Sequence, residues 1–129
     1  MRPTESREDY LETILMLSQT TPYVRSIDVA AHLGVTKPSV SRAISLLKTS
    51  GLLEMDAHDG ALTLTAQGRA LAEGVYSRHK ALTTFLTQIG VDPKIAAQDA
   101  CRIEHIISEE SMTCIRAAVK KAEDAKNNE

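Results

Sequence analysis

The stretch from residue 26 to residue 64 constrains the fold more than any other part of the chain, because its periodicity changes from that of helices to that of strands. Ser26 is placed to cap a short helix over residues 27–33, and Gly34 can adopt the left-handed conformation that ends it. Thr36 is placed to cap a second helix, which then runs to about residue 50. Two helices joined by a tight glycine turn predict a helix-turn-helix, although a plain helical hairpin with a solvated polar face has the same pattern.

The second helix of this pair presents cations and no acidic residue. Between Val29 and Gly51 the chain has three cations and no acid, whereas its net charge is −2. We therefore expect a local basic surface that faces a phosphate backbone, and not a general binder of polyanions. The amino end of the second helix meets base edges and phosphates in helix-turn-helix proteins. The DNA-binding residues predicted in this region are Thr36, Lys37, Pro38, Ser39, Ser41, Arg42 and Lys48.

A β-hairpin is predicted directly after the helix pair. Residues 53–57 and 61–64 alternate like strands, and His58-Asp59-Gly60 stands between them. Asp-Gly between strand-like runs is a strong hairpin signal, and a two-stranded ribbon after a helix-turn-helix is a wing. His58 at its tip is a further candidate for contact with DNA, although a loop histidine is more often merely exposed.

The rest of the chain is predicted to be helical. A first helix begins at a Ser6 cap, and a later one over residues 66–89 is too long for a small winged domain to cover. We expect two parts, a winged helix-turn-helix DNA-binding domain over residues 1–72 and a helical metal-binding and dimerisation domain over residues 73–129. The predicted fold class is mainly α with a small β-hairpin wing.

Asp92 is placed to cap a helix over residues 93–108, and Ser108 to cap a last helix after it. The helix over residues 93–108 carries three side chains that can bind a metal. Cys101, Glu104 and His105 lie three and four residues apart, so they project from one face of a helix. Glu and His at this spacing also occur on solvated surfaces, and a lone Cys is commonly a buried packing residue. The motif by itself therefore leaves a metal site and an ordinary helix surface both open.

The two cysteines and the hydropathy bear on the compartment. Cys101 and Cys114 make no disulfide framework, so we expect thiols in a reducing cytosol. The chain has no apolar run of about 18 residues and no amino terminus like a signal peptide, which predicts a cytoplasmic protein without a membrane partner. Aromatic residues make up 3% of the chain, which argues against a single-strand binder that stacks bases.

Five segments spread over nearly the whole chain are specific as a set, although none of them is decisive alone. They are Glu8-Asp9-Tyr10-Leu11-Glu12, Thr36-Lys37-Pro38-Ser39-Val40-Ser41, Leu64-Thr65-Ala66-Gln67-Gly68, Arg78-His79 and Cys101-Arg102-Ile103-Glu104-His105. In this order and spacing they resemble the metal-dependent repressors typified by the diphtheria toxin repressor and the shorter manganese transport regulators.

The resemblance implies six metal ligands. The manganese branch has the first-helix carboxylates that match Asp9 and Glu12, whereas the iron branch has Met at the position of Asp9. Without the resemblance, Asp9 is equally well a helix-capping acid and Glu12 a solvated side chain. Cys101 departs from the pattern of the manganese branch, which has Glu at that position, and matches the iron branch, which has Cys. The implied ligands are Asp9, Glu12, His79, Cys101, Glu104 and His105.

The implied ligands suit both Mn²⁺ and Fe²⁺, so they do not by themselves identify the ion. Hard oxygens with imidazole suit Mn²⁺ and Fe²⁺, whereas a thiolate favours Fe²⁺, Co²⁺ or Zn²⁺. We expect Mn²⁺ first and Fe²⁺ next, with Co²⁺ or Zn²⁺ able to bind in vitro. The ancillary site of the iron branch is not expected, because Thr83 and Ala97 stand at its ligand positions. Its SH3-like domain is not expected either, because the chain stops at Glu129.

The function that the resemblance implies is repression of metal-uptake genes. The ion would tie the two parts together, so that a homodimer binds double-stranded operator DNA. Apolar residues in the second part give indirect support for the dimer: Ile89, Ile95, Ile106 and Ile107. The alternatives are a winged-helix regulator that does not sense metal, a winged-helix protein-interaction module and a helical metalloenzyme. No Glu-x-x-His motif repeats on two helices, so we expect neither an enzyme nor a small-molecule substrate.

Overall fold

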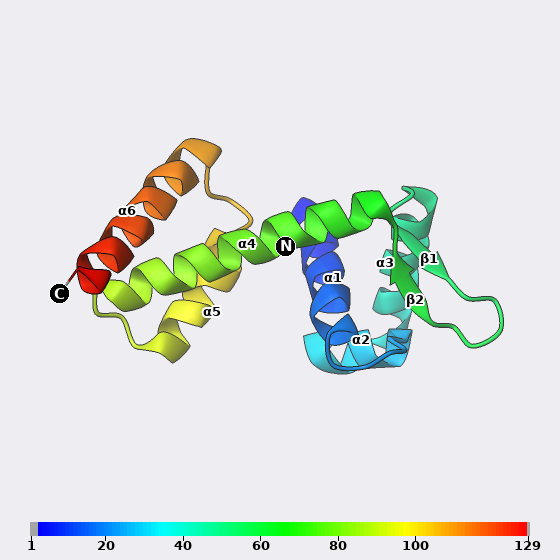
Figure 1. The fold of residues 1–129 in the computed structure, drawn as a ribbon. Helices are drawn as coiled ribbons and strands as arrows, with labels where there is room; N and C mark the ends of the chain where they lie inside the picture. The colour runs from blue at the N-terminus through cyan, green and yellow to red at the C-terminus, as the bar shows by residue number, and fades with distance from the viewer. Residues whose placement is uncertain (1–2, 129) are drawn as a thin grey trace. The chain divides into compact units, whose positions relative to one another are not determined.

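The computed structural model describes residues 3–128, with side chains from residue 6 onward. Six helices and one hairpin form within this range (Figure 1). The chain divides into two compact units, and the division falls inside the longest helix: unit 1 is Met1–Gly74 and unit 2 is Val75–Glu129. The predicted class, mainly α with a β-hairpin wing, is confirmed. The elements are α1 (Pro3–Ser18), α2 (Ser26–Leu33), α3 (Lys37–Thr49), β1 (Leu53–Met55), β2 (Leu62–Leu64), α4 (Ala66–Gln88), α5 (Pro93–Ile103) and α6 (Glu109–Asn127).

The helix-turn-helix of unit 1 is formed by α2 and α3. Gly34 ends α2 with φ +67°, and its N–H donates to the carbonyl of Ala30 at 2.9 Å. Thr36 caps α3, since its hydroxyl oxygen accepts the N–H of Ser39 at 3.3 Å. The predicted glycine turn and the predicted threonine cap are therefore both present.

Two helix starts differ from those predicted. The first helix, α1, starts at Pro3 and not after a Ser6 cap, because proline is accommodated in a first turn that needs no internal N–H partner. In α2, Ser26 is the first helical residue and Arg25 occupies the cap position. The N–H of Arg25 donates to the Asp28 carboxylate at 2.9 Å, which fixes this start one residue earlier.

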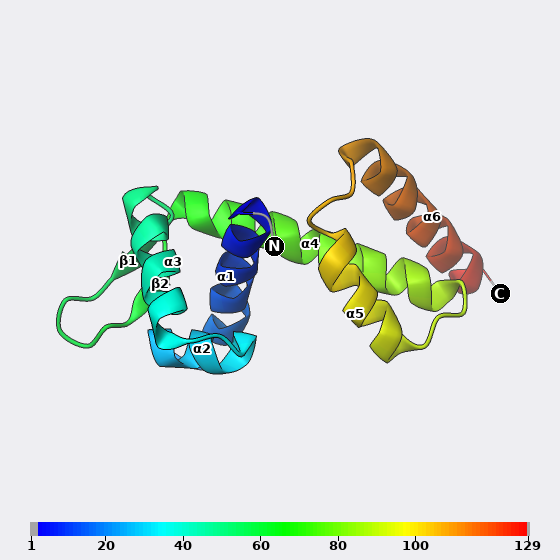
Figure 2. The same cartoon turned by 180° about the vertical axis from the view of Figure 1, so that it is seen from behind.

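Unit 1 packs its three amino-terminal helices and its hairpin around one aliphatic core. Helix α1 contacts α2, α3 and β2, and α3 contacts β1. Figure 2 shows these elements from behind. The N–H of Leu62 donates to the carbonyl of Val24 at 2.7 Å, which ties β2 to the segment before α2. The largest fully buried side chains of this unit are Leu11, Ile14, Val29 and Val40.

The hairpin is shorter in strand and longer in loop than predicted. Leu53 pairs with Leu64 and Met55 with Leu62, and the loop lies between the two strands. The carboxylate of Asp56 accepts the N–H groups of His58 at 2.8 Å and Asp59 at 3.0 Å. These bonds curl the chain immediately after Met55, so the strands stop at three residues each.

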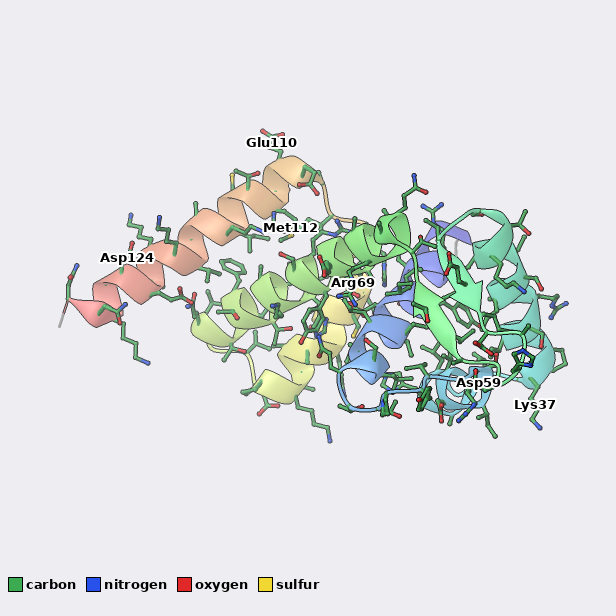
Figure 3. All side chains as sticks on the ribbon, turned by 45° about the vertical axis from the view of Figure 1, so that its right-hand side comes forward. Lys37, Asp59, Arg69, Glu110, Met112 and Asp124 are labelled. Atoms are coloured by element: carbon green, nitrogen blue, oxygen red, sulfur yellow. The ribbon has the colours of Figure 1, made fainter. Side chains whose placement is uncertain are left out.

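Unit 2 packs helices around Leu82 of α4, Ala100 of α5 and Met112 of α6. Figure 3 shows Met112 pointing from α6 toward α4, and its side chain is fully buried. Helix α5 is capped by Asp92, whose carboxylate accepts the N–H of Lys94 at 3.1 Å. Helix α6 is capped by Ser108, whose hydroxyl accepts the N–H of Ser111 at 3.1 Å. Both caps agree with the sequence prediction.

Large apolar side chains remain exposed on unit 2. Ile89, Ile95 and Ile106 are 64%, 47% and 60% exposed. Ile107, which is predicted to share this surface, instead packs against the core of unit 2. Among the described residues, no helix is both long and apolar enough to cross a membrane.

Candidate functional site

Four of the six predicted ligands converge in unit 2 around one carboxylate. The Glu104 side chain has one oxygen 2.8 Å from Nδ1 of His79 and the other 3.4 Å from Nε2 of His105. The sulfur of Cys101 lies 3.8 Å from Nδ1 of His79. Glu104 is only 1% exposed, and the His105 side chain is 4% exposed. Residues from α4, from α5 and from the turn after α5 thus lie next to one another, with His79 and His105 beside the two Glu104 oxygens and Cys101 beside His79.

The end of α5 differs from the predicted helix over residues 93–108. The helix stops at Ile103, and Glu104 takes the cap position with helical dihedral angles, its N–H bonded to the carbonyl of Ala100 at 3.0 Å. Cys101 and Glu104 therefore still lie one turn apart, as predicted. His105 belongs to the turn that follows. A longer helix is prevented because Ser108 must be extended to cap α6.

The chemistry of this cluster fits a divalent metal ion. A buried carboxylate is unfavourable unless positive charge or hydrogen-bond donors surround it, and Glu104 lies between two imidazoles. Imidazole nitrogen, carboxylate oxygen and thiolate sulfur are the protein ligands of first-row divalent cations. His79, Cys101, Glu104 and His105 can therefore supply four ligand atoms from one unit.

The two predicted carboxylate ligands of unit 1, Asp9 and Glu12, lie one turn apart on α1. Glu12 is buried, at 8% exposure, so the interpretation of Glu12 as a solvated side chain is wrong. Asp9 is the seventh residue of α1, beyond the first turn, so it is not a capping acid. Neither carboxylate therefore has the role, helix cap or solvated side chain, that the sequence offered as an alternative to metal binding.

The predicted DNA-binding residues of unit 1 lie on α3 and the hairpin. All of them are exposed except Ser39, which is half-buried and whose side-chain oxygen accepts the Thr36 hydroxyl at 3.0 Å. Figure 3 shows Lys37 extending outward from the start of α3. No acidic residue occurs on α3. The exposed members of the set are Thr36, Lys37, Pro38, Ser41, Arg42, Lys48 and His58.

Two arginines contact these regions without having a predicted role. The Nε of Arg25 donates to the carbonyl of Asp59 at the hairpin tip, at 2.9 Å. The Nε of Arg78 donates to the carbonyl of Glu104 at 2.8 Å. Both contacts join residues more than 20 positions apart, so no local pattern points to them. The signals are that Arg78 directly precedes the candidate ligand His79 and that Arg78-His79 is one of the five segments of the family resemblance.

Two family models match the chain. One, described as the iron dependent repressor N-terminal DNA binding domain, matches residues 3–61. The other, described as the iron dependent repressor metal binding and dimerisation domain, matches residues 65–127. The two matches together cover all six described helices and β1, and β2 lies in the gap between them.

Similar individual proteins are also transcriptional regulators. The transcriptional regulator MntR of Escherichia coli O6:H1 is 40% identical over 114 residues, which cover 88% of this chain and 73% of that protein. The HTH-type transcriptional regulator MntR of Lysinibacillus sphaericus is 36% identical over 122 residues, 95% of this chain and 87% of that protein. A solved structure described as a manganese-dependent transcriptional repressor complex with manganese matches with a TM-score of 0.81 and 30% identity. That match covers 88% of this chain and 52% of the solved chain, so this chain spans about half its length.

Proposed function

Because this chain belongs to the family of metal-dependent transcriptional repressors that includes the MntR regulators, we propose that a divalent cation switches on its binding to operator DNA. The relatives are regulators, so this chain is a regulator and not an enzyme. The observation that carries the proposal is the buried carboxylate of Glu104, which lies between the imidazoles of His79 and His105.

The proposed ligand set joins residues of both units. His79, Cys101, Glu104 and His105 already meet in unit 2, and they leave room in the coordination shell of an ion that prefers six ligands. Asp9 and Glu12 would complete it. Their support is the resemblance of the first-helix segment to the manganese branch and the burial of the Glu12 side chain.

The ion that we propose first is Mn²⁺. Support comes from the oxygen-rich ligand set and from relatives that are described as MntR or as manganese-dependent. Cys101 supplies a softer ligand than the carboxylates, so Fe²⁺ is the second candidate, and Co²⁺ or Zn²⁺ would bind in vitro.

The proposed mechanism is a shift between arrangements of the two units. Asp9, Glu12 and Glu104 are carboxylates and repel one another when they approach. A bound divalent cation supplies the positive charge that offsets this repulsion. By binding ligands of both units, the cation would then favour one arrangement of the units. The size of the shift would depend on the difference in the affinity of the cation for the two arrangements.

We further propose that the arrangement so favoured is a dimer on duplex DNA. The exposed side chains of Ile89, Ile95 and Ile106 offer apolar surface for a second copy of the chain. Two copies of α3 about one DNA turn apart would match the spacing that helix-turn-helix dimers require. Operator binding would place the protein where the chromosome is, in the cytoplasm.

A pair of variants tests the proposed division of labour. Glu104→Gln keeps the shape of the side chain and removes its charge, so it should abolish metal-stimulated DNA binding while the fold remains. Arg42→Ala should weaken DNA binding without altering metal affinity, because Arg42 is an exposed residue of α3 and is not among the proposed ligands. Metal affinity is measured against a competing chelator and DNA affinity by fluorescence anisotropy. Undiminished metal stimulation in Glu104→Gln would remove the site assignment, and a loss of metal affinity in Arg42→Ala would contradict the separation of roles.

A further inference from the structure

Arg78 connects three helical elements of unit 2 beside the candidate metal ligands. It directly precedes His79 on α4, and its side chain is 19% exposed. Its Nε donates to the main-chain carbonyl of Glu104 at 2.8 Å. Its Nη1 lies 3.9 Å from the carboxylate of Glu109, the first residue of α6. One guanidinium therefore contacts the turn that carries two of the proposed ligands and the helix that follows it.

The bond to the Glu104 carbonyl is the stronger of the two contacts. Glu104 is the C-cap residue of α5, at the end of the helix where carbonyls lack partners within the helix and the negative end of the helix dipole lies. A guanidinium that donates there makes a charge-assisted hydrogen bond, which is stronger than a neutral one. The Glu109 carboxylate is 78% exposed, so its attraction for Arg78 is largely screened by water.

This bond fixes the backbone from which the ligands project. The Glu104 N–H donates to the Ala100 carbonyl at 3.0 Å and the Glu104 carbonyl accepts from Arg78, so both polar groups of the residue are held. The N–H groups of Ile106 and Ile107 both donate to Ile103 at 3.0 Å, which closes the turn around His105. A ligand side chain that projects from a fixed backbone loses little conformational freedom when it binds an ion.

We propose that Arg78 is a positioning residue for the metal centre, which holds Glu104 and His105 in place without touching the ion. This inference rests on the proposed function. It assigns the effect to the hydrogen bond that Nε donates and not to the charge of the guanidinium.

Three substitutions of Arg78 separate the hydrogen bond from the charge. Arg78→Met removes both and keeps an unbranched side chain that reaches as far as the position of Nε. Arg78→Gln is neutral but has an amide nitrogen the same number of bonds from the backbone as Nε. Arg78→Lys keeps the charge but puts a methylene at that position. Arg116→Met is the matched control, because it removes a cation of unit 2 that contacts Ser77 and not the ligand turn.

The assay is equilibrium binding of Mn²⁺ alone to the full chain in a chelator buffer, well below the unfolding temperature of every variant. Thermal unfolding in excess chelator is recorded in parallel, to detect a general loss of stability. Arg78→Met should weaken Mn²⁺ binding by about 10- to 100-fold, the usual effect of removing a group that orients a metal ligand. Arg78→Gln should recover about half of that loss or more on a logarithmic scale, since a neutral hydrogen bond is roughly half as strong. Arg78→Lys should recover less than Arg78→Gln, and Arg116→Met should bind like the wild type.

The possible results separate the two proposals. Wild-type affinity in Arg78→Met, or a lysine variant that binds better than the glutamine variant, would overturn the role of the hydrogen bond while leaving the metal site intact. If Arg78→Met should unfold, the comparison of the glutamine and lysine variants still decides. Failure of the wild-type chain to bind Mn²⁺, Fe²⁺, Co²⁺ or Zn²⁺ would instead overturn the proposed function, and with it the role of Arg78.

Discussion

Replacement of Gly68 by alanine tests how closely the start of α4 packs against the chain that enters the wing. A Cβ at Gly68 would lie 2.0 Å from the carbonyl oxygen of Leu52 and 2.9 Å from its carbonyl carbon. The same Leu52 oxygen accepts the N–H of Thr65 at 3.1 Å, and the Thr65 hydroxyl donates to Gly51 at 2.8 Å. The obstacle is therefore backbone that is held in place by two hydrogen bonds.

The expected loss of stability follows from this geometry. Real Cβ atoms essentially never come within 3.0 Å of such a neighbour, so the backbone at Gly68 and Leu52 must separate by at least 1 Å. Overpacking of this kind costs about 1–3 kcal/mol, and an immobile obstacle places the cost near 3. Alanine is about 1 kcal/mol better than glycine within a helix, so the net loss is about 2 kcal/mol. For a unit of this size the thermal midpoint should fall on the order of 10 °C.

The control is Gly74→Ala in the same helix. A Cβ at Gly74 meets nothing within 4 Å, so this variant should be more stable than the wild type by up to about 1 kcal/mol. Unfolding in urea and on heating, followed by circular dichroism, measures both variants. A Gly68→Ala protein that is as stable as Gly74→Ala would refute the close packing of α4 on Leu52.

Three further predictions concern the core, the wing and its tip. Met112→Ala removes a fully buried side chain of unit 2 and should lower the free energy of unfolding by about 2–5 kcal/mol in chemical denaturation, whereas an unchanged midpoint would contradict its burial. Arg25→Met removes the bond to the Asp59 carbonyl at the wing tip; loss of one hydrogen bond of about 1 kcal/mol should weaken DNA binding about fivefold in anisotropy titrations without changing metal affinity. The N–H groups of Asp59 and His58 lower the pKa of the Asp56 carboxyl below its ordinary value of 3.8. The ionised carboxylate therefore stabilises the folded turn above pH 3.8, and this stabilisation is lost as the pH falls through the lowered pKa. An NMR titration that finds the pKa of Asp56 at 3.8 or higher would contradict this turn.

Features that depend on neighbouring residues were predictable from the sequence. Gly34 ends α2, and Thr36 caps α3, because a turn glycine and a capping hydroxyl act within a few residues of their own position. The same holds for the caps at Asp92 and Ser108. The convergence of Cys101, Glu104 and His105 was predictable as a helix face, although the face ends in a turn.

Features that depend on long-range contacts were not predictable. The end of α5 is set partly by Arg78, which lies 26 residues before Glu104 in the chain. The tether from Arg25 to Asp59 spans 34 residues. The short strands of the wing result from the bonds of one carboxylate, Asp56, which competes with strand pairing in a way that hydropathy does not record. Burial of Glu12 likewise has no signature in the pattern of α1.

The measurement that tests the central claim most directly is a titration of duplex DNA at fixed salt with and without Mn²⁺. The duplex would be selected from a random library by the protein itself, once in the presence of Mn²⁺ and once with chelator. We expect Mn²⁺ to tighten binding of the selected duplex by tenfold or more, which is about 1.4 kcal/mol of coupling, and chelator to reverse it. The same affinity for DNA with chelator, Mn²⁺, Fe²⁺, Co²⁺ or Zn²⁺ would contradict the claim that metal controls this protein.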